Sequence, residues 1–471
     1  MSSATAALES KPQYHRLGSG GSATTLATPD LGQSGNNKDK KKSFSLKIVP
    51  GGVTQSMFTL ISTSMGGGVL CLPYVMKQAG VINGVILLTL SSGIALLTMY
   101  LLMECAQRTG RGSYGSLLGS CCGKWSAVVM DVIMFFYGMG TMTAYLILEG
   151  DFLPALMAWI GSRVSRTVCI CVVALVAVPL ILPEKLSVLR HVTPISTAAL
   201  IFTAICTLIQ APGRAQALPE DMSVDLASFG WPLLKCLTIT LFAYICHTNV
   251  VPVANEMVDP TPKKSFQVCF RVAVVQLGFY VLIGVSGYLS FLGTTHQNYI
   301  TNYPHDDVLI NLCRLAMALS LMCSIPINTN PTARAAVHFI TSMKEVMTSS
   351  HHQPLLPGRE RLPSNLRTES RREKILRISI SLALLVVTLT IAILVPGIAD
   401  VVSLLGGSLG TLLLATCPCI IFARVMKQEA SRPLGKTIIW TLIIVTVVAM
   451  FAVCIMVTNA MGITHIPLAV N

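Results

Sequence analysis

The chain has 471 residues, of which 52% are hydrophobic and 12% are charged. That charged share is about half the share found in soluble proteins. Long apolar stretches follow one another with short polar joints, which indicates one integral membrane unit rather than several soluble domains. The formal net charge of +13 does not indicate a nucleic-acid partner. The basic residues gather in tails and at the ends of apolar stretches, the distribution that sets membrane topology.

Residues 1–47 are rich in Ser, Gly and Thr and end in a lysine-rich run. Such a segment buries too little apolar surface to fold, and we predict a disordered basic tail. The lysines lie next to the first apolar stretch and place this end of the chain in the cytosol. The tail is therefore available to cytosolic partners.

The first apolar stretch, residues 53–79, is long enough to cross a bilayer as a helix. Near its middle stand three consecutive glycines, at 66–68, with three hydroxyl residues just before them. Each glycine costs a helix roughly 1 kcal/mol relative to alanine. A helix interrupted at membrane depth is tolerated only where protein or a wet cavity covers the loosened backbone. We interpret this break as a ligand site rather than as a simple kink.

Ten further spans are predicted by the remaining apolar stretches, at about 85–104, 125–150, 164–182, 187–210, 230–257, 266–292, 305–334, 375–395, 398–422 and 438–461. With eleven spans and a cytosolic N-terminus, the tail 462–471 lies outside the cell or in a lumen. The polar, basic joint 341–374 then lies in the cytosol. This parity agrees with the charge distribution, because the joints assigned to the cytosol hold most of the Lys and Arg.

The sixth span carries a second interruption. Tyr244, His247, Thr248 and Asn249 crowd its centre, and Pro252 removes a helix hydrogen bond. Interruptions at corresponding positions of two halves indicate a transporter whose binding site lies between inverted repeats. The spacing of the two breaks, five spans apart, carries this interpretation.

Four motifs give the chain its resemblance to the amino acid/auxin permease family, and in particular to the sodium-coupled neutral amino acid transporter group. They are Met65-Gly66-Gly67-Gly68-Val69-Leu70 with Pro73-Tyr74, Phe242-Ala243-Tyr244-Ile245-Cys246-His247, Ile325-Pro326 to Pro331 with Arg334, and Ser403-Leu404-Leu405-Gly406-Gly407-Ser408. The resemblance covers roughly residues 50–460. It implies an all-α membrane protein of the leucine-transporter fold, with two inverted five-helix repeats plus one helix. It also implies secondary active transport of amino acids by alternating access.

One position departs from the sodium-coupled group. Ser62 stands where that group has an asparagine that contributes to the cation site. A hydroxyl is still an oxygen ligand, but the amide carbonyl is gone, so the resemblance leaves sodium and proton coupling both open. His247 titrates near physiological pH when it is exposed, and a buried neutral histidine is the alternative. Asp131, inside the third span, is a second candidate for proton coupling.

The expected site residues follow from these interpretations. Substrate binding is assigned to Thr63, Ser64, Met65, Gly66, Gly67, Gly68, Val69, Phe242, Ala243, Tyr244 and Cys246. Cation binding is assigned to Ser62, Ser320 and Ser324, and proton coupling to His247 or Asp131. No catalytic residue, metal site or cofactor is predicted, apart from Na⁺ or H⁺ as the coupling ion.

The site stretches contain no charged residue, which favours neutral amino acids, because an unpaired buried charge costs several kcal/mol. Asp131 or Glu256 reaching the cavity would instead suit arginine or lysine. An amino-acid sensor that transports little is the other function class considered. Cys417-Pro418-Cys419 resembles the motif of heavy-metal pumps, but no soluble phosphorylation domain accompanies it, and we interpret it as a kink. An enzyme is not expected. The plasma membrane and a vacuolar or lysosomal membrane both fit.

Overall fold

The computed structural model describes residues 51–182, 192–348, 371–395 and 397–463. Over these ranges all regular structure is helical, with no strand. Nine helices there are long and apolar enough to cross a membrane, and a pair bent by 57° at residues 65–66 makes a tenth. The shorter apolar helix α6 (Arg166–Ile181) lies at the predicted fourth span. The order of elements therefore matches the eleven spans predicted from the sequence.

The helices that carry the spans are, in chain order, α1 (Val53–Ser64) with α2 (Leu72–Ala79), α3 (Val81–Thr109), α5 (Lys124–Trp159), α6, α7 (Val192–Gln216), α8 (Pro232–Ala243) with α9 (His247–Glu256), α10 (Pro262–Leu289), α11 (Val308–Thr348), α12 (Arg371–Leu394), α13 (Ile398–Leu405) continuing to α14 (Cys417–Val425), and α16 (Pro433–Ala460). The connecting helices are η1 (Gly67–Cys71), α4 (Tyr114–Cys122), η3 (Leu292–Thr294), η4 (Tyr299–Asn302), η5 (Gly406–Gly410), η6 (Leu412–Thr416) and α15 (Lys427–Ser431).

Several helices run further than the sequence patterns predict. Helix α5 continues past residue 150 to Trp159, because the residues after Asp151 are again largely apolar. Helices α11 and α12 reach into the predicted joint 341–374 at its two ends. The tail 1–47, the middle of that joint and nearly all of 462–471 lie outside the described residues.

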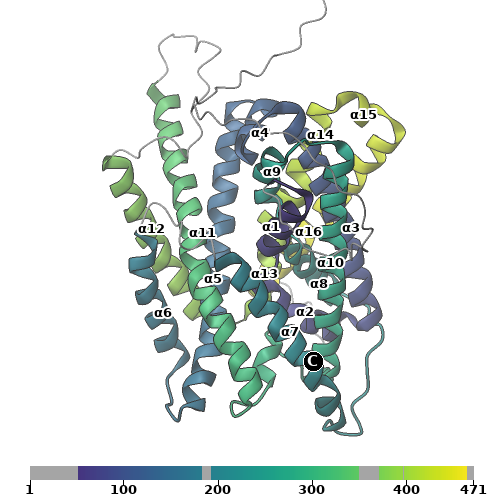
Figure 1. The fold of residues 1–471 in the computed structure, drawn as a ribbon, viewed down its shortest axis with the longest axis vertical. Coiled ribbons are helices and arrows are strands. Elements are labelled where there is room, and N and C mark those ends of the chain that lie inside the picture. The colour runs from purple at the N-terminus through teal and green to yellow at the C-terminus, as the bar shows by residue number, and fades with distance from the viewer. Residues whose placement is uncertain (1–50, 183–191, 349–370, 396, 464–471) are drawn as a thin grey trace, which may run out of the picture. The chain divides into compact units, whose positions relative to one another are not determined.

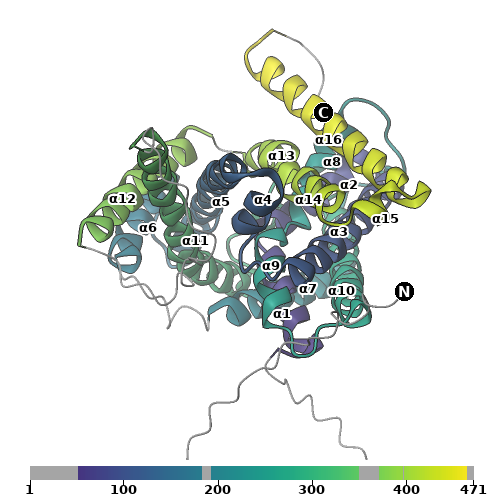
Figure 2. The ribbon, with the colours of Figure 1, turned by 90° about the horizontal axis from the view of Figure 1, so that it is seen from above.

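The broken helix pair α8–α9 lies at the centre of the bundle. In its most apolar window 72% of the residues are buried, compared with 28% in α16. Figures 1 and 2 show α6, α11 and α12 on one side of the bundle and α3 and α10 on the other, with α1 and α13 between them. Large apolar side chains such as Leu90, Leu175 and Val386 are exposed on the outer faces, where the hydrocarbon of a bilayer would cover them.

Polar contacts gather at the two ends of the bundle. At the end assigned to the cytosol, Arg108 pairs with Glu429 at 2.9 Å, and Asp131 pairs with His338. At the opposite end, Arg214 pairs with Asp307 at 2.8 Å. The odd and even joints of the chain therefore lie on opposite sides.

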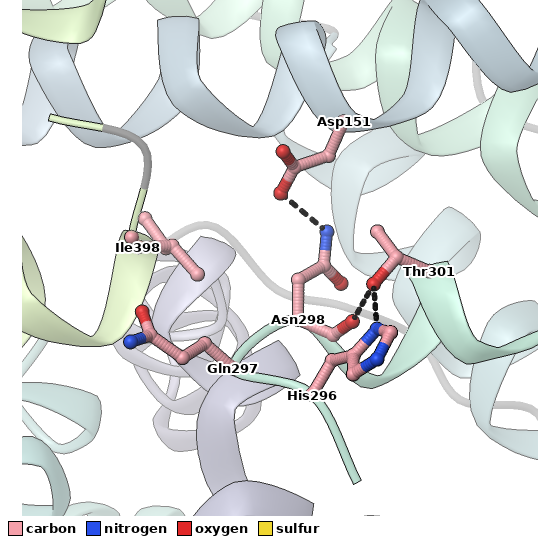
Figure 3. A pocket seen from close by; sticks show the side chains of 7 residues that line it. Asp151, His296, Gln297, Asn298, Thr301 and Ile398 are labelled. Atoms are coloured by element: carbon pink, nitrogen blue, oxygen red, sulfur yellow. Dashed lines mark hydrogen bonds between the residues drawn. The ribbon is translucent and has the colours of Figure 1, made fainter. Parts of the chain in front are cut away.

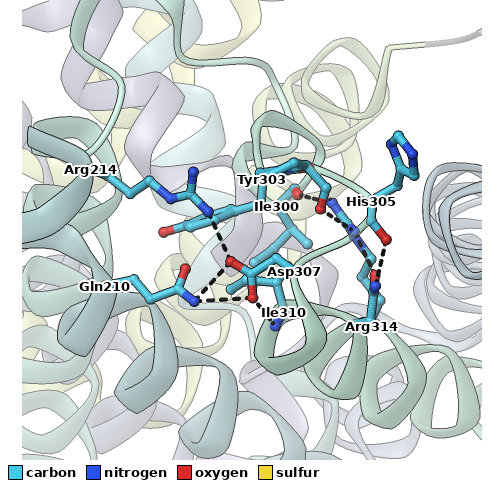
Figure 4. A network of polar contacts seen from close by, with 10 residues as sticks. Gln210, Arg214, Ile300, Tyr303, His305, Asp307, Ile310 and Arg314 are labelled. Carbon is cyan, nitrogen blue, oxygen red and sulfur yellow. Dashed lines mark hydrogen bonds and ion pairs between the residues drawn. The ribbon is translucent and has the colours of Figure 1, made fainter. Parts of the chain in front are cut away.

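A polar frame fixes the connection between α10 and α11 at the outer end (Figure 4). The buried guanidinium of Arg314 donates to the carbonyls of Ile300 (3.0 Å), Tyr303 (2.6 Å) and Pro304 (3.1 Å). Asp307 accepts from the Ile310 N–H at 3.1 Å at the start of α11. Burial would raise the pKa of the Asp307 carboxyl, but this hydrogen bond and those from Gln210 and Arg214 hold its pKa below the usual range.

Candidate functional site

The first break leaves a short extended segment between two helices. Helix α1 ends at Ser64, and the chain is extended at Met65 (φ −71°, ψ 90°) and Gly66 (φ −134°, ψ −160°) before η1 begins at Gly67. Helix α2 then continues in a direction bent by 57° from α1. The glycine run therefore breaks the span at the point that the sequence predicts.

The break frees backbone groups of both kinds. Among the described residues, the N–H groups of Gly66, Gly67 and Gly68 donate to no other group. The Ile61 carbonyl accepts from the Met65 N–H at 2.9 Å, but no N–H within the described ranges donates to the carbonyls of Ser62 to Ser64. Free N–H groups at a helix start attract a carboxylate, and free carbonyls at a helix end attract a cation. Both groups of a zwitterionic amino acid can thus be matched.

The second break lies at Tyr244 to Cys246, between α8 and α9. The Ala243 carbonyl accepts from the Tyr280 hydroxyl at 2.8 Å, and the rings of Tyr244 and Tyr280 are 5.0 Å apart. The Cys246 sulfur lies 3.2 Å from the Met99 sulfur. Residues of α3 and α10 therefore pack against this break and fix its position as one wall of the site.

The two breaks face each other. The Asn249 amide donates to the Thr63 hydroxyl at 2.8 Å. A Cβ added to Gly68 would lie 2.8 Å from the ring of Phe242. Ser64 accepts from the buried amide of Gln276 on α10. These contacts place the predicted substrate residues of the first and sixth spans together.

Helix α5 supplies a third wall that the sequence does not indicate. A Cβ added to Gly67 would collide with Leu148, whereas one added to Gly66 would meet only the Tyr145 hydroxyl, at 3.7 Å. Tyr137, two turns earlier on α5, lies 6.2 Å from the Phe242 ring. Of the three glycines, only Gly66 faces unfilled space.

The predicted cation ligands do not contact one another through hydrogen bonds between their side chains in the described part of the chain. The Ser62 hydroxyl donates to the Thr59 carbonyl of its own helix at 3.1 Å. The Ser324 hydroxyl likewise donates to the Ser320 carbonyl at 2.8 Å. No hydrogen bond links Ser62 with either serine of α11 among the described residues.

The two predicted proton-coupling residues lie apart from each other. His247 is fully buried, with its Nε2 2.9 Å from the Thr98 hydroxyl and its Nδ1 without a partner in the described part of the chain. Asp131 lies at the cytosolic end of α5, where it pairs with His338 of α11. Glu256, the other acid considered, is exposed at the end of α9.

A small pocket of about 240 Å³ lies at the outer end, between α5, the α10–α11 connection and α13. Figure 3 shows Asn298 pointing to Asp151, with Gln297 on the other side beside Ile398. Asn298 donates to Asp151 at 3.0 Å, and Gln297 donates to Asp400 at 3.2 Å. One two-residue segment therefore links α5 with α13 across the outer end.

The sequence analysis missed several buried charged residues, and two of them lie on the helices that form the site. Lys235 on α8 pairs with Asp400 at 2.6 Å and lies over the Tyr74 ring. Glu149 on α5 is 1% exposed, and its Oε1 has no hydrogen-bond partner within the described ranges. Both lie inside predicted apolar spans, which is the general signal of function. In the third span that signal was assigned to Asp131 alone.

Two facing broken helices in an all-helical membrane bundle are the arrangement of the leucine-transporter fold. Comparison with protein families identifies the group within that fold. The family model described as transmembrane amino acid transporter protein matches residues 50–463. The chain therefore belongs to this family, the amino acid/auxin permeases, as the four motifs predict.

Similar proteins are found in several organisms. The amino acid transporter named AAT1 of Toxoplasma gondii is 29% identical over 344 residues, which are 71% of this chain and 47% of that protein. Sodium-coupled neutral amino acid transporter 7 of Xenopus laevis is 25% identical over 416 residues, 85% of this chain and 84% of that protein. The chain spans about half the length of the first three relatives, 47%, 53% and 50% of each.

A solved structure confirms the fold. The manganese transporter of Eremococcus coleocola superposes with a TM-score of 0.54, covering 87% of each chain at 12% sequence identity. At that identity the likeness concerns the arrangement of helices alone. The protein is thus a multi-pass membrane protein with the fold predicted from its motifs.

Proposed function

We propose that the protein is a secondary active transporter that moves amino acids across a membrane by alternating access. The observation that carries this proposal is the pair of facing breaks, with free N–H groups at Gly66 to Gly68 and free carbonyls at the end of α1. The N–H groups would bind the substrate carboxylate, and the carbonyls would bind its ammonium group. Family membership supports the same assignment.

Small and medium neutral amino acids are the proposed substrates. The walls nearest the break are the apolar or aromatic side chains of Leu148, Phe242 and Tyr137 and the hydroxyl of Tyr145. A cationic side chain against these walls would lack a counter-charge, which is costly in an apolar site. Competition of labelled alanine or glutamine uptake by a panel of amino acids checks this choice. Stronger competition by arginine or lysine than by every neutral member would refute it.

The coupling ion is proposed to be H⁺ or Na⁺. Ser62, Ser320 and Ser324 are the proposed oxygen ligands for Na⁺, with first-span carbonyls completing the shell. Uptake measured in sodium and in choline, at two pH values, separates the two ions. Strict sodium dependence that persists in Ser62→Ala would show that this site assignment is wrong.

A further part of the proposal concerns the two chain ends and the joint 341–374, which lie largely outside the described residues. We propose that 1–47 is a cytosolic tail that binds cytosolic partners, that the middle of 341–374 is a cytosolic loop, and that 462–471 is a short outer or luminal tail. The basic composition of the first two segments supports this placement. The plasma membrane and a vacuolar or lysosomal membrane are the proposed locations.

Reconstitution into liposomes tests the central proposal. The wild-type protein is expected to accumulate labelled amino acid, and Gly66→Leu is expected to abolish uptake while the protein remains in the membrane. Gly93→Leu is the matched control, because Gly93 on α3 is exposed and a Cβ added there meets nothing within 4 Å. Binding without accumulation by the wild type would instead identify a sensor. Near-normal uptake by Gly66→Leu would refute the assigned substrate site.

A further inference from the structure

One buried carboxyl group near the site is not used by the assignment above. Glu149 lies on α5 directly after Leu148, which contacts Gly67, and one helical turn after Tyr145, which faces Gly66. Its side chain is almost fully buried, and its Oε1 has no hydrogen-bond partner among the described residues. It is thus an unpartnered acid beside the contact between the broken helix and α5.

The charged groups on the elements packed against α5 are engaged elsewhere. On α6, Arg166 lies 3.7 Å from Asp151, and on α12, Arg377 donates to Asn330 at 2.9 Å. On α13, Asp400 pairs with Lys235, and on α11, Arg314 and Asp307 belong to the outer frame. Asp131 of α5 pairs with His338 at the far end. Glu149 makes no ion pair within the described residues.

Helix α11 supplies groups that lie next to the Glu149 carboxyl. The backbone of Met322 and the thiol of Cys323 interact electrostatically with the Glu149 carboxyl. Four residues after Met322 stands Pro326, inside α11. Because proline has no N–H, the Met322 carbonyl lacks its usual helical donor. A protonated carboxyl can donate a hydrogen bond to a free carbonyl, and an ionised one cannot.

We propose that Glu149 is the group that binds and releases the coupling proton of this transporter. The proposal rests on the transport function proposed above and names the ion. A proton adds to one carboxylate oxygen of Glu149, and the carboxyl group becomes neutral. On release, the proton leaves to water and the carboxylate is restored, with no other bond changed.

The position of Glu149 explains how protonation would control the site. An ionised carboxylate in a dry environment is strongly disfavoured, so the charged form requires water near α5. The neutral form allows Leu148 and Gly67 to pack directly against each other, as they do in this structure. Closure of the broken helix on α5 around a bound amino acid therefore occurs with the protonated form. Release of the proton favours reopening.

Transport assays on Glu149→Gln test the proposal, because glutamine resembles the protonated acid. If only the protonated form closes on substrate, the half-saturating concentration of the wild type rises up to about tenfold per pH unit above the pKa of the group. We expect Glu149→Gln to exchange internal for external amino acid with less than about twofold pH dependence. It should lose accumulation driven by a pH gradient and substrate-induced acidification of the liposome interior.

Two further variants keep the test decisive. Glu149→Asp retains an acid and should still couple, with a shifted pH profile, and it decides the matter if the glutamine variant fails to reach the membrane. Glu104→Gln on α3 is the matched control, because Glu104 is also a buried glutamate whose Oε1 lacks a partner in the described ranges. Its pH dependence should equal that of the wild type.

Several results would overturn the proposal. Proton-coupled accumulation by Glu149→Gln, an unchanged pH profile in Glu149→Asp, or wild-type uptake that depends only on sodium would each do so. Loss of arginine and lysine uptake alone in Glu149→Gln would make Glu149 a counter-charge for substrate instead. Absence of any wild-type uptake is a different result, since it would refute the transport function itself.

Discussion

Gly66→Ala is the substitution that best separates ligand binding from packing at the first break. At Gly66 an added methyl group meets only the Tyr145 hydroxyl, at an ordinary contact distance of 3.7 Å. The backbone there (φ −134°, ψ −160°) is open to any residue. We therefore expect the free energy of unfolding of the variant to differ from that of the wild type by no more than about 0.5 kcal/mol, which is usual for substitutions away from strained or packed positions. Its methyl group nevertheless occupies the space proposed for the substrate.

The expected loss of affinity follows from the hydrogen bonds involved. A hydrogen bond between an N–H group and a carboxylate contributes about 1.5–3 kcal/mol. If the methyl group displaces the substrate carboxylate from one such N–H, the half-saturating concentration should rise about 10- to 150-fold. Gly68→Ala should behave differently, because its methyl group would lie 2.8 Å from the Phe242 ring. Overpacking of that kind costs about 1–3 kcal/mol of stability.

Thermal unfolding in detergent and concentration-dependent uptake in liposomes provide the two measurements. Gly93→Ala serves as the control, since its methyl group meets no other atom within 4 Å. A normal half-saturating concentration in Gly66→Ala, with wild-type stability, would contradict the backbone-recognition model. A large loss of stability in that variant would show instead that Gly66 is needed for packing.

Three further predictions concern the outer end. Arg314→Met should lower the free energy of unfolding, measured in thermal melts, by about 3 kcal/mol or more, because each of the three carbonyls left without a donor costs about 1 kcal/mol. An unchanged free energy of unfolding would show that the Arg314 hydrogen bonds do not stabilise this connection. Asp307→Asn should flatten the acid limb of stability against pH, because a depressed carboxyl pKa stabilises the fold above the unfolded pKa and that gain is lost as the pH falls through the folded pKa. An unchanged acid limb would contradict this. Lys235→Met should cost about 1 kcal/mol or less in thermal melts, because Asp400 in this pair is 52% exposed. A loss above about 3 kcal/mol would mean that the pair acts as a buried one.

The order of spans and both breaks could be predicted because they depend on local properties. A run of glycines at 66–68 weakens the helix wherever it stands. Apolar length sets the spans, and the alternation of basic joints sets their direction. The structure agrees on the order of the spans and on both breaks, where α1 ends at Ser64 and α8 ends at Ala243.

The composition of the site could be predicted only in part, because it depends on packing between distant helices. Periodicity in α5 does not show that Leu148 and Tyr145 face the glycine run. Nor does it show that Asp131 finds a partner in His338, while Glu149 finds none among the described residues. Both acids have the same signal in the sequence, a carboxylate in an apolar span. Only their neighbours on α11 distinguish them.

The same packing determines how charge would move during transport. The walls at the break are uncharged, and a neutral amino acid bound there is a zwitterion with no net charge. If Glu149 is protonated in the closed, loaded form, as proposed above, the loaded site is neutral and the empty, deprotonated site carries one negative charge. A membrane potential exerts about 2.3 kcal/mol per elementary charge per 100 mV across the full membrane. It would therefore act on the return of the empty protein rather than on the loaded step. Each cycle would still carry one net positive charge with the substrate.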